Sequence, residues 1–391
     1  MARNITTEKL PEGWTYGLLD DFSVRCSGHT PSKSYPEYWD GGIKWISLAD
    51  SHRLDKGYVF ETDNEISPEG VKNSSAEIHP AETVVLSRDA GIGKSGVMAQ
   101  PMAVSQHFIA WICDNTNQLH SWFLYNWFQF HKREFERQAV GSTIKTIGLP
   151  YFKKLKIAVP PFPEQKKIAQ ILFTWDQAIT ATKRLLENSQ QRKKGLMQQL
   201  LTGKKRLPGF EGEWEKIELG DVLKYQQPTP FLVKSTKYSN EFPTPVLTAG
   251  KTFLLGYTDE NFGIYSKDLP AVIFDDFTTA SQFVDFPFKA KSSAMKILTP
   301  KSGYSIRYIF GVMQMLRFSV GGHQRHWISI FANLVIPCPS FEEQNAISEV
   351  LCTADKEIAA LHNHLDMLKH EKKALMQQLL TGKWRVQVEA A

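Results

Sequence analysis

The sequence is poor in the features that mark secreted, membrane-spanning or metal-binding proteins. Its 391 residues include only four cysteines, and Cys26, Cys113, Cys338 and Cys352 form no CxxC pair and join no histidine cluster. This spacing predicts free thiols in a reducing compartment and no metal site. The chain also lacks an apolar run of about 18 residues and a charged start followed by an apolar stretch, so we expect neither a membrane span nor a signal peptide. We therefore expect a cytoplasmic protein.

The chain lacks a strong excess of either charge. Its 46 basic and 41 acidic residues give a net charge of +5, which permits nucleic-acid binding without requiring it. A protein that holds DNA by itself is expected to be more basic, so we infer that partner proteins share the binding. The length allows two or three domains.

Motifs that would carry catalysis fail on their context. Residues Gly91–Gly96 fit the GxGxxG pattern of a dinucleotide site, but Pro101 and a β-favouring run follow where a helix should begin. The phosphate-loop pattern also fails, because Arg88 stands where its first glycine is needed. We expect a glycine-rich hairpin instead. Glu371 and Lys373 imitate part of a nuclease centre, yet they fall in a long helical pattern whose charges usually face solvent. The sequence therefore predicts no catalytic residue of its own.

An internal repeat organises the chain. Residues 196–204 and 375–383 both read LMQQLLTGK, and the same offset of 179 aligns residues 152–206 without a gap. Each copy begins with a proline-containing stretch and closes with Gly203 or Gly382, which is the usual punctuation of a helix. In the first copy the helix is predicted from about 164 to 202, a length of about 58 Å.

Each long helix has an apolar seam that repeats every seven residues, so each requires a partner helix. The seam residues are Leu172, Ile179, Leu186, Leu200, Leu351, Ile358, Leu365 and Leu379, with Lys193 and Lys372 in equivalent layers. The simplest partner is the other copy, and a pseudo-two-fold axis would make the two helices antiparallel. Arg385 should then point back toward Leu10-Pro11, which would make the chain pseudo-circular.

Two modules of mixed α+β character accompany the helices. The predicted segments are a first module at 1–155, a helical spacer at 156–206, a second module at 207–335 and a second spacer at 336–391. Strands are expected at 44–48, 83–86, 246–248 and 271–274, and helices at 121–137 and 305–317. The aromatic residues of 121–137 are expected to pack in a core, with part of that helix available to a partner. The modules differ outside their edges, which favours two binding surfaces with different ligands.

The layout of module, long helix, module and long helix resembles the specificity subunit of type I restriction–modification systems. The resemblance covers essentially the whole chain. Its most specific marks are Pro160–Gln165 and Pro339–Gln344, the QQLLTG helix ends, Gly28–Ser32 followed by Trp39 and Trp45–Ser47, and Leu247–Lys251 with Phe274–Phe277. One departure is Gly28-His29, where the family more often has Gly-Gly.

The resemblance implies two target-recognition domains that read an asymmetric, bipartite DNA site for defence against foreign DNA. Its implied partners are double-stranded DNA, two methyltransferase subunits and restriction (helicase–nuclease) subunits. S-adenosylmethionine would lie in the methyltransferase, and ATP and Mg in the restriction subunit, with no cofactor in this chain. The alternatives are the detached recognition half of a single-chain restriction–methylation enzyme and a decoy that binds methyltransferase subunits.

Polar and basic residues on loops of both modules are the candidates for DNA contact, with an ordinary solvated surface as the alternative for each. In the first module they are Thr30, Ser32, Arg88, Lys94, Ser142, Thr143 and Lys145. In the second they are Thr248, Lys251, Thr278, Lys289, Lys291, Ser292, Ser293, His323, Gln324 and Arg325. Trp45 and Trp327 are expected in the core. Basic residues between Lys183 and Lys194 are predicted to face either the DNA spacer or an acidic partner.

Overall fold

The computed structural model describes residues 10–113, 117–141, 145–250, 252–316 and 326–388. Its contacts group the chain into two units: unit 1 holds residues 1–182 and 364–391, and unit 2 holds 183–363. Each unit therefore contains one module together with a part of both long helices. The segment boundaries expected from the sequence stay a prediction.

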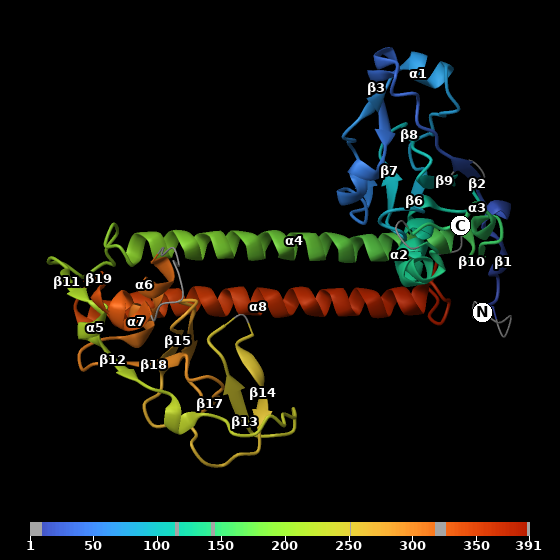
Figure 1. Cartoon of the computed structure of the whole chain (residues 1–391). Coiled ribbons are helices and arrows are strands. Elements are labelled where there is room, and N and C mark those ends of the chain that lie inside the picture. The colour runs from blue at the N-terminus through green and yellow to red at the C-terminus, as the bar shows by residue number, and fades with distance from the viewer. Residues whose placement is uncertain (1–9, 114–116, 142–144, 251, 317–325, 389–391) are drawn as a thin grey trace. The chain divides into compact units, whose positions relative to one another are not determined.

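The two long helices are α4 (Phe162–Leu200) and α8 (Phe341–Leu379), each 39 residues long and uninterrupted in Figure 1. Both begin close to the positions that the repeat predicts. Beyond their ends, Gly203 and Gly382 adopt φ values of 71° and 68°, a left-handed conformation that glycine adopts without strain. The backbone N–H groups of Lys205 and Trp384 then turn back to the carbonyls of Gln199 and Gln378.

Within each unit, the parts of the two long helices run antiparallel. In unit 1, Ile168 and Leu172 share an apolar cluster with Met376, Leu379 and Leu380. In unit 2, Leu200 and Leu201 share one with Ile347 and Leu351. Of the eight predicted seam residues, seven are buried and Ile358 is half-buried. The coiled-coil prediction is confirmed.

The seam lysines are satisfied by ion pairs that repeat between the units. In unit 1, the Lys372 Nζ lies 2.6 Å from a carboxylate oxygen of Asp176. In unit 2, Lys193 pairs in the same way with Asp355. Asp176 and Asp355 occupy equivalent positions of the repeat, so both pairs favour the same antiparallel register.

A Glu–Arg clamp with a buried carboxylate closes the scaffold in each unit. In unit 2, Arg206 donates two hydrogen bonds of 2.6 Å to Glu343. In unit 1, Arg385 donates bonds of 2.7 and 2.8 Å to Glu164. Arg385 also donates to the carbonyl oxygen of Glu12 at 2.7 Å. This contact confirms that the last part of the chain returns to the segment beside Leu10-Pro11.

The module of unit 1 contains two sheets, whose strand orders are β2-β9-β6-β7-β4 and β5-β3-β8. The strands are β2 (Val24–Ser27), β3 (Trp39–Ile46), β4 (Tyr58–Val59), β5 (Glu65–Ile66), β6 (Val84–Ser87), β7 (Ser95–Met98), β8 (Ala103–Val104) and β9 (Phe108–Ile112). Helix α2 (Ser121–Gln138) packs on the larger sheet.

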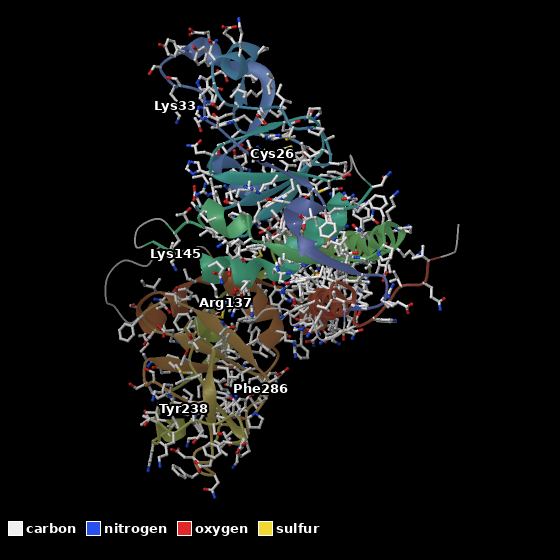
Figure 2. All side chains as sticks on the ribbon, turned by 90° about the vertical axis from the view of Figure 1, so that its right-hand side faces the viewer. Cys26, Lys33, Arg137, Lys145, Tyr238 and Phe286 are labelled. Carbon is white, nitrogen blue, oxygen red and sulfur yellow. The ribbon has the colours of Figure 1, made fainter. Side chains whose placement is uncertain are left out.

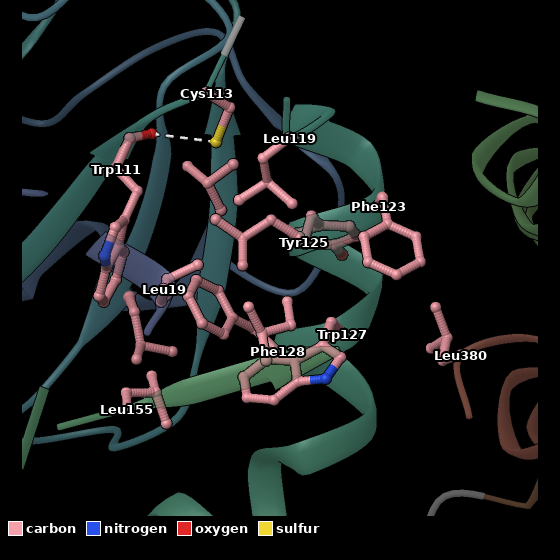
Figure 3. Packing of buried hydrophobic residues seen from close by; sticks show 14 of the residues in the cluster. Leu19, Trp111, Cys113, Leu119, Phe123, Tyr125, Trp127, Phe128, Leu155 and Leu380 are labelled. Carbon is pink, nitrogen blue, oxygen red and sulfur yellow. Dashed lines mark hydrogen bonds between the residues drawn. The ribbon is translucent and has the colours of Figure 1, made fainter. Parts of the chain in front are cut away.

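Aromatic side chains of α2 form the core of unit 1, as the sequence predicts. Phe123, Tyr125, Trp127 and Phe128 are buried, and Figure 3 shows them between the sheet and Leu380, which follows α8. The ring centroids of Trp111 and Phe128 lie 5.0 Å apart. Aromatic pairs at such separations add to the energy of apolar burial.

The module of unit 2 also contains two sheets, with strand orders β12-β18-β15-β16 and β14-β13-β17. The strands are β12 (Leu223–Gln226), β13 (Thr244–Leu247), β14 (Leu254–Thr258), β15 (Ala271–Asp275), β16 (Ser281–Val284), β17 (Lys289–Ala290) and β18 (Met295–Pro300). Helix α6 (Ile306–Met315) packs against the larger sheet.

A two-stranded sheet joins each module to the scaffold. In unit 1, β1 (Thr15–Leu18) pairs with β10 (Lys156–Val159), and in unit 2, β11 (Glu215–Glu218) pairs with β19 (Val335–Cys338). The short helices are α1 (Pro68–Lys72), α3 (Leu149–Phe152), α5 (Leu219–Val222) and α7 (His326–Ser329). Among the helices described, none is long and apolar enough to cross a bilayer.

The two glycines that follow the long helices should differ in their tolerance of a side chain. A Cβ at Gly382 would lie 2.3 Å from Pro11 Cγ, whereas one at Gly203 would approach Trp214 to only 3.3 Å. We expect Gly203→Ala to lower the free energy of unfolding by about 1–2 kcal/mol because of its left-handed backbone. Gly382→Ala should lower the free energy of unfolding by a larger amount, because Pro11 must also move. Urea unfolding would measure both, and equal losses would contradict this prediction.

Candidate functional site

A buried glutamine joins each long helix to its module. The Gln165 Oε1 accepts a hydrogen bond of 2.8 Å from the N–H of His120, the residue before α2. In unit 2, the Gln344 Oε1 accepts one of 2.8 Å from the N–H of Ser305, the residue before α6. Each glutamine thus satisfies a backbone donor at the start of the module's helix, where donors lack partners within the helix. This contact explains the Glu-Gln pair in both copies.

The glycine-rich segment of the first module forms the turn between β6 and β7. Gly91 and Gly93 have φ values of 84° and 78°, and strand β7 follows directly, so the predicted hairpin is confirmed. Arg88 and Lys94 flank this turn, and both side chains are held by residues outside it. The Arg88 Nε donates to the carbonyl of Ile147 at 3.1 Å, and the Lys94 Nζ donates to Ser51 Oγ at 3.0 Å.

A chain of hydrogen bonds brings several predicted contact residues onto one surface. Thr30 donates through its hydroxyl to Gln106, and the next residue, His107, accepts the backbone N–H of Arg88 through its carbonyl at 3.0 Å. The His107 Nδ1 lies 2.6 Å from Asp89 Oδ2, and Thr146 donates to the other oxygen of that carboxylate. The exposed Lys145 precedes Thr146.

A basic cavity continues this surface beside the β6–β7 turn. Its volume is about 440 Å³, and Lys94, Lys132 and Lys145 line it together with Glu136 and the turn residues 90–92. Lys132 is paired with Asp55 at 2.5 Å. The other two lysines still outnumber the single carboxylate, so the cavity suits a phosphate group better than a cation. Figure 2 shows Lys33 and Lys145 projecting from the same side of the first module.

The segment after β2 is held by two tryptophans. The Trp45 indole donates to the carbonyl of His29 at 3.0 Å, and the Trp39 indole donates to that of Ser32 at 3.2 Å. Their rings meet edge to face at 5.2 Å. Trp45 is buried, as predicted, while Ser32 is exposed. These contacts explain why Gly28–Ser32 and the two tryptophans occur together.

Two polar loops meet in the second module. The Asp275 Oδ1 accepts the backbone N–H groups of Phe277 and Thr278, which shapes the turn after β15. The N–H of Asp276 reaches the carbonyl of Ala294 at 3.1 Å, so the exposed Thr278 lies on the same edge as Ser292 and Ser293.

Thr248 and Lys291 are more enclosed. The Thr248 hydroxyl donates to the carbonyl of Thr252, and the Lys291 Nζ bonds the Tyr238 hydroxyl at 3.1 Å. Both side chains therefore stabilise the module.

Lys289 is a correction to the predicted set. Its side chain is fully buried, with the Nζ 2.6 Å from the carbonyl of Phe262 and 3.0 Å from Glu260. Burial would raise the pKa of Glu260, but hydrogen bonds from Ser235 and Lys289 lower it below its usual value. Lys289 therefore satisfies a buried carboxylate instead of facing a ligand.

Six predicted contact residues, Ser142, Thr143, Lys251, His323, Gln324 and Arg325, lie outside the described residues. Trp327 is buried, as predicted, and its backbone N–H bonds Asp276 at 2.9 Å. Lys132 lines the cavity although it belongs to a helix that the sequence assigns to the core, so the sequence does not predict it as a contact residue.

Most of the chain is similar in sequence to known proteins. Residues 11–188 and 211–370 match the family model described as the type I restriction modification DNA specificity domain. The chain is 44% identical over 191 residues to the type I restriction enzyme EcoR124I/EcoR124II specificity subunit of Escherichia coli, a match covering 46% of this chain and 47% of that relative. It is 23% identical over 434 aligned residues to the MjaVIII specificity subunit of Methanocaldococcus jannaschii, covering 97% and 94% of the two chains.

Solved structures share the fold. The S subunit of a type I restriction–modification system from M. genitalium has a TM-score of 0.63 at 16% identity, with 95% of this chain and 98% of that one covered. A chain from a structure described as the basis of complex assembly and conformational transition of the type I R-M system has a TM-score of 0.58 at 15% identity, covering 96% and 100%. At these identities the likeness concerns the fold alone.

Lys145 provides a test of the basic surface. We expect Lys145→Gln to weaken binding to DNA of any sequence by a similar factor, because a phosphate contact carries no base information. The slope of log affinity against log salt should fall by about 1. The control is Lys72→Gln in α1, an exposed lysine outside this surface. Duplex binding at several salt concentrations would show the difference, and equal slopes in both variants would contradict the assignment.

Proposed function

Because the chain belongs to the type I restriction modification DNA specificity family, we propose that it is the DNA-reading, non-catalytic subunit of a type I restriction–modification complex. It reads an asymmetric, bipartite site, with one half-site for each module. The spacer between the half-sites is left unread.

The observation that carries this proposal is a repeated scaffold that holds two unlike surfaces. The Glu–Arg clamp, the Lys–Asp pair and the capping glutamine occur in both units. The polar surfaces differ: lysines around a glycine turn in the first module, and hydroxyl residues on two joined loops in the second. Equal supports with unlike surfaces favour two half-sites of different sequence.

Catalysis would then come from partners. We propose two methyltransferase subunits, which hold S-adenosylmethionine and methylate adenine, and restriction subunits, which use ATP and Mg. An aromatic patch in unit 1 supports protein docking: Phe60 and Phe173 are 63% and 40% exposed, and the Trp122 ring lies 5.6 Å from that of Phe173. A cavity of about 350 Å³ adjoins it. Exposed aromatic surface of this kind is typical of protein interfaces.

The proposed function is tested by co-expressing the chain with the methyltransferase subunits of its own system and mapping methylated adenines over a whole genome. We expect one motif made of two different half-sites separated by a fixed number of unread base pairs. A contiguous motif, or no motif above the level of the methyltransferase alone, would overturn the proposal.

A second test changes the length of the long helices. Removing residues 180–186 from α4 and 362–368 from α8 takes one heptad from each and leaves the Lys193–Asp355 and Lys372–Asp176 pairs in place. The helices would shorten by about 10 Å, so the spacer should shorten by about three base pairs with the half-sites unchanged.

The control for the double deletion is the deletion of 180–186 alone. It puts α4 and α8 out of register, so no active complex should form. An active double deletion with an unchanged spacer, measured by the same mapping, would contradict the idea that the helices set the spacing.

A further inference from the structure

The backbone of His29 is fixed on both sides by the core of the first module. Its N–H donates to the carbonyl of Val104 at 3.0 Å, and its carbonyl accepts the indole N–H of Trp45 at 3.0 Å. The preceding residue must be glycine, because a Cβ at Gly28 would lie 2.1 Å from the Val104 oxygen. Pro31, two residues later, is buried. Residue 29 therefore has little freedom to move.

The side chains of His29 and Thr30 differ in the hydrogen-bonding groups that they present to a ligand. The Thr30 hydroxyl is half-buried and already donates to Gln106. The imidazole of His29 is exposed, and within the described part of the chain it has no hydrogen-bond partner. A neutral imidazole carries one donor and one acceptor nitrogen, which are the groups needed to read a base edge in a groove.

His29 also stands beside the basic surface. Through Thr30 and Gln106 it is linked to His107, whose carbonyl accepts the N–H of Arg88. Lysines that suit phosphates line the adjoining cavity. A donor–acceptor side chain on a fixed backbone next to phosphate-binding groups is the arrangement that base recognition requires, because phosphate contacts set the position from which side chains reach the bases.

We propose that His29 is a specificity-determining residue, which reads a base in the half-site of the first module, and that Trp45 is its positioning residue. This inference rests on the proposed DNA-reading function. Trp45 acts through the backbone of His29, so the two residues are expected to affect the same base position.

The test uses His29→Ala in the complex assembled with methyltransferase subunits. Methylation rates would be measured on duplexes that carry each of the four bases at every position of the motif. We expect discrimination at one position of one half-site to fall about ten-fold or more, the range of a lost base contact. The other half-site and the spacer should not change. His52→Ala is the matched control, since His52 is an exposed histidine of the same module.

Trp45→Phe tests the positioning role, because it keeps a ring and removes the donor to His29. It should reduce discrimination between bases at the same position as His29→Ala does. The double variant should show no further loss of discrimination there. Because Trp45 is buried, unfolding curves are recorded alongside. Trp39→Phe is a second variant for the case that Trp45→Phe folds poorly. Trp39 is half-buried, and its indole donates to Ser32. This variant should also reduce base discrimination in the half-site of the first module.

The outcomes separate this inference from the function on which it rests. If the unaltered complex methylates a bipartite motif and His29→Ala shows the same base preferences at every position, the inference is wrong. If the unaltered complex methylates no bipartite motif, the proposed function itself fails.

Discussion

Each unit depends on a buried glutamate whose charge is balanced by an arginine from beyond the end of the other long helix. Glu343 and Glu164 are 1% and 3% exposed, and each receives two hydrogen bonds from Arg206 or Arg385. A buried carboxylate that loses its partner costs about 3–5 kcal/mol. The antiparallel direction of the helices and the return of the chain after each helix follow from satisfying these two charges.

The clamps lead directly to the surfaces that we assign to DNA. Gln165 follows Glu164 in the chain and bonds the N–H just before α2, and α2 packs against the sheet whose β6–β7 turn carries Arg88 and Lys94. Gln344 serves α6 in the same way. A single dipeptide thus connects the charge that orders the helices to the element that supports the module.

The sequence predicts what repeats or has a period, and it fails where the answer depends on distant neighbours. The long helices, their seam and the return of Arg385 follow from the 179-residue offset and the heptads. The inward direction of Lys289 does not, because β17 has only two residues and Glu260 lies in the loop after β14. His29 is not among the predicted contact residues for the same reason: its backbone is fixed by Trp45 and by Val104, which lies far along the chain.

Each Glu–Arg clamp and each Lys–Asp pair joins one copy of the repeat to the other, and each copy carries both members of each kind of pair. Glu164 and Arg206 belong to the first copy, while Glu343 and Arg385 belong to the second. A chain of half this length would therefore satisfy its charges by pairing with an identical molecule. Such a homodimer, with two equal surfaces, would be restricted to palindromic sites. Duplication and fusion remove that restriction, since the two halves of one gene can then diverge independently.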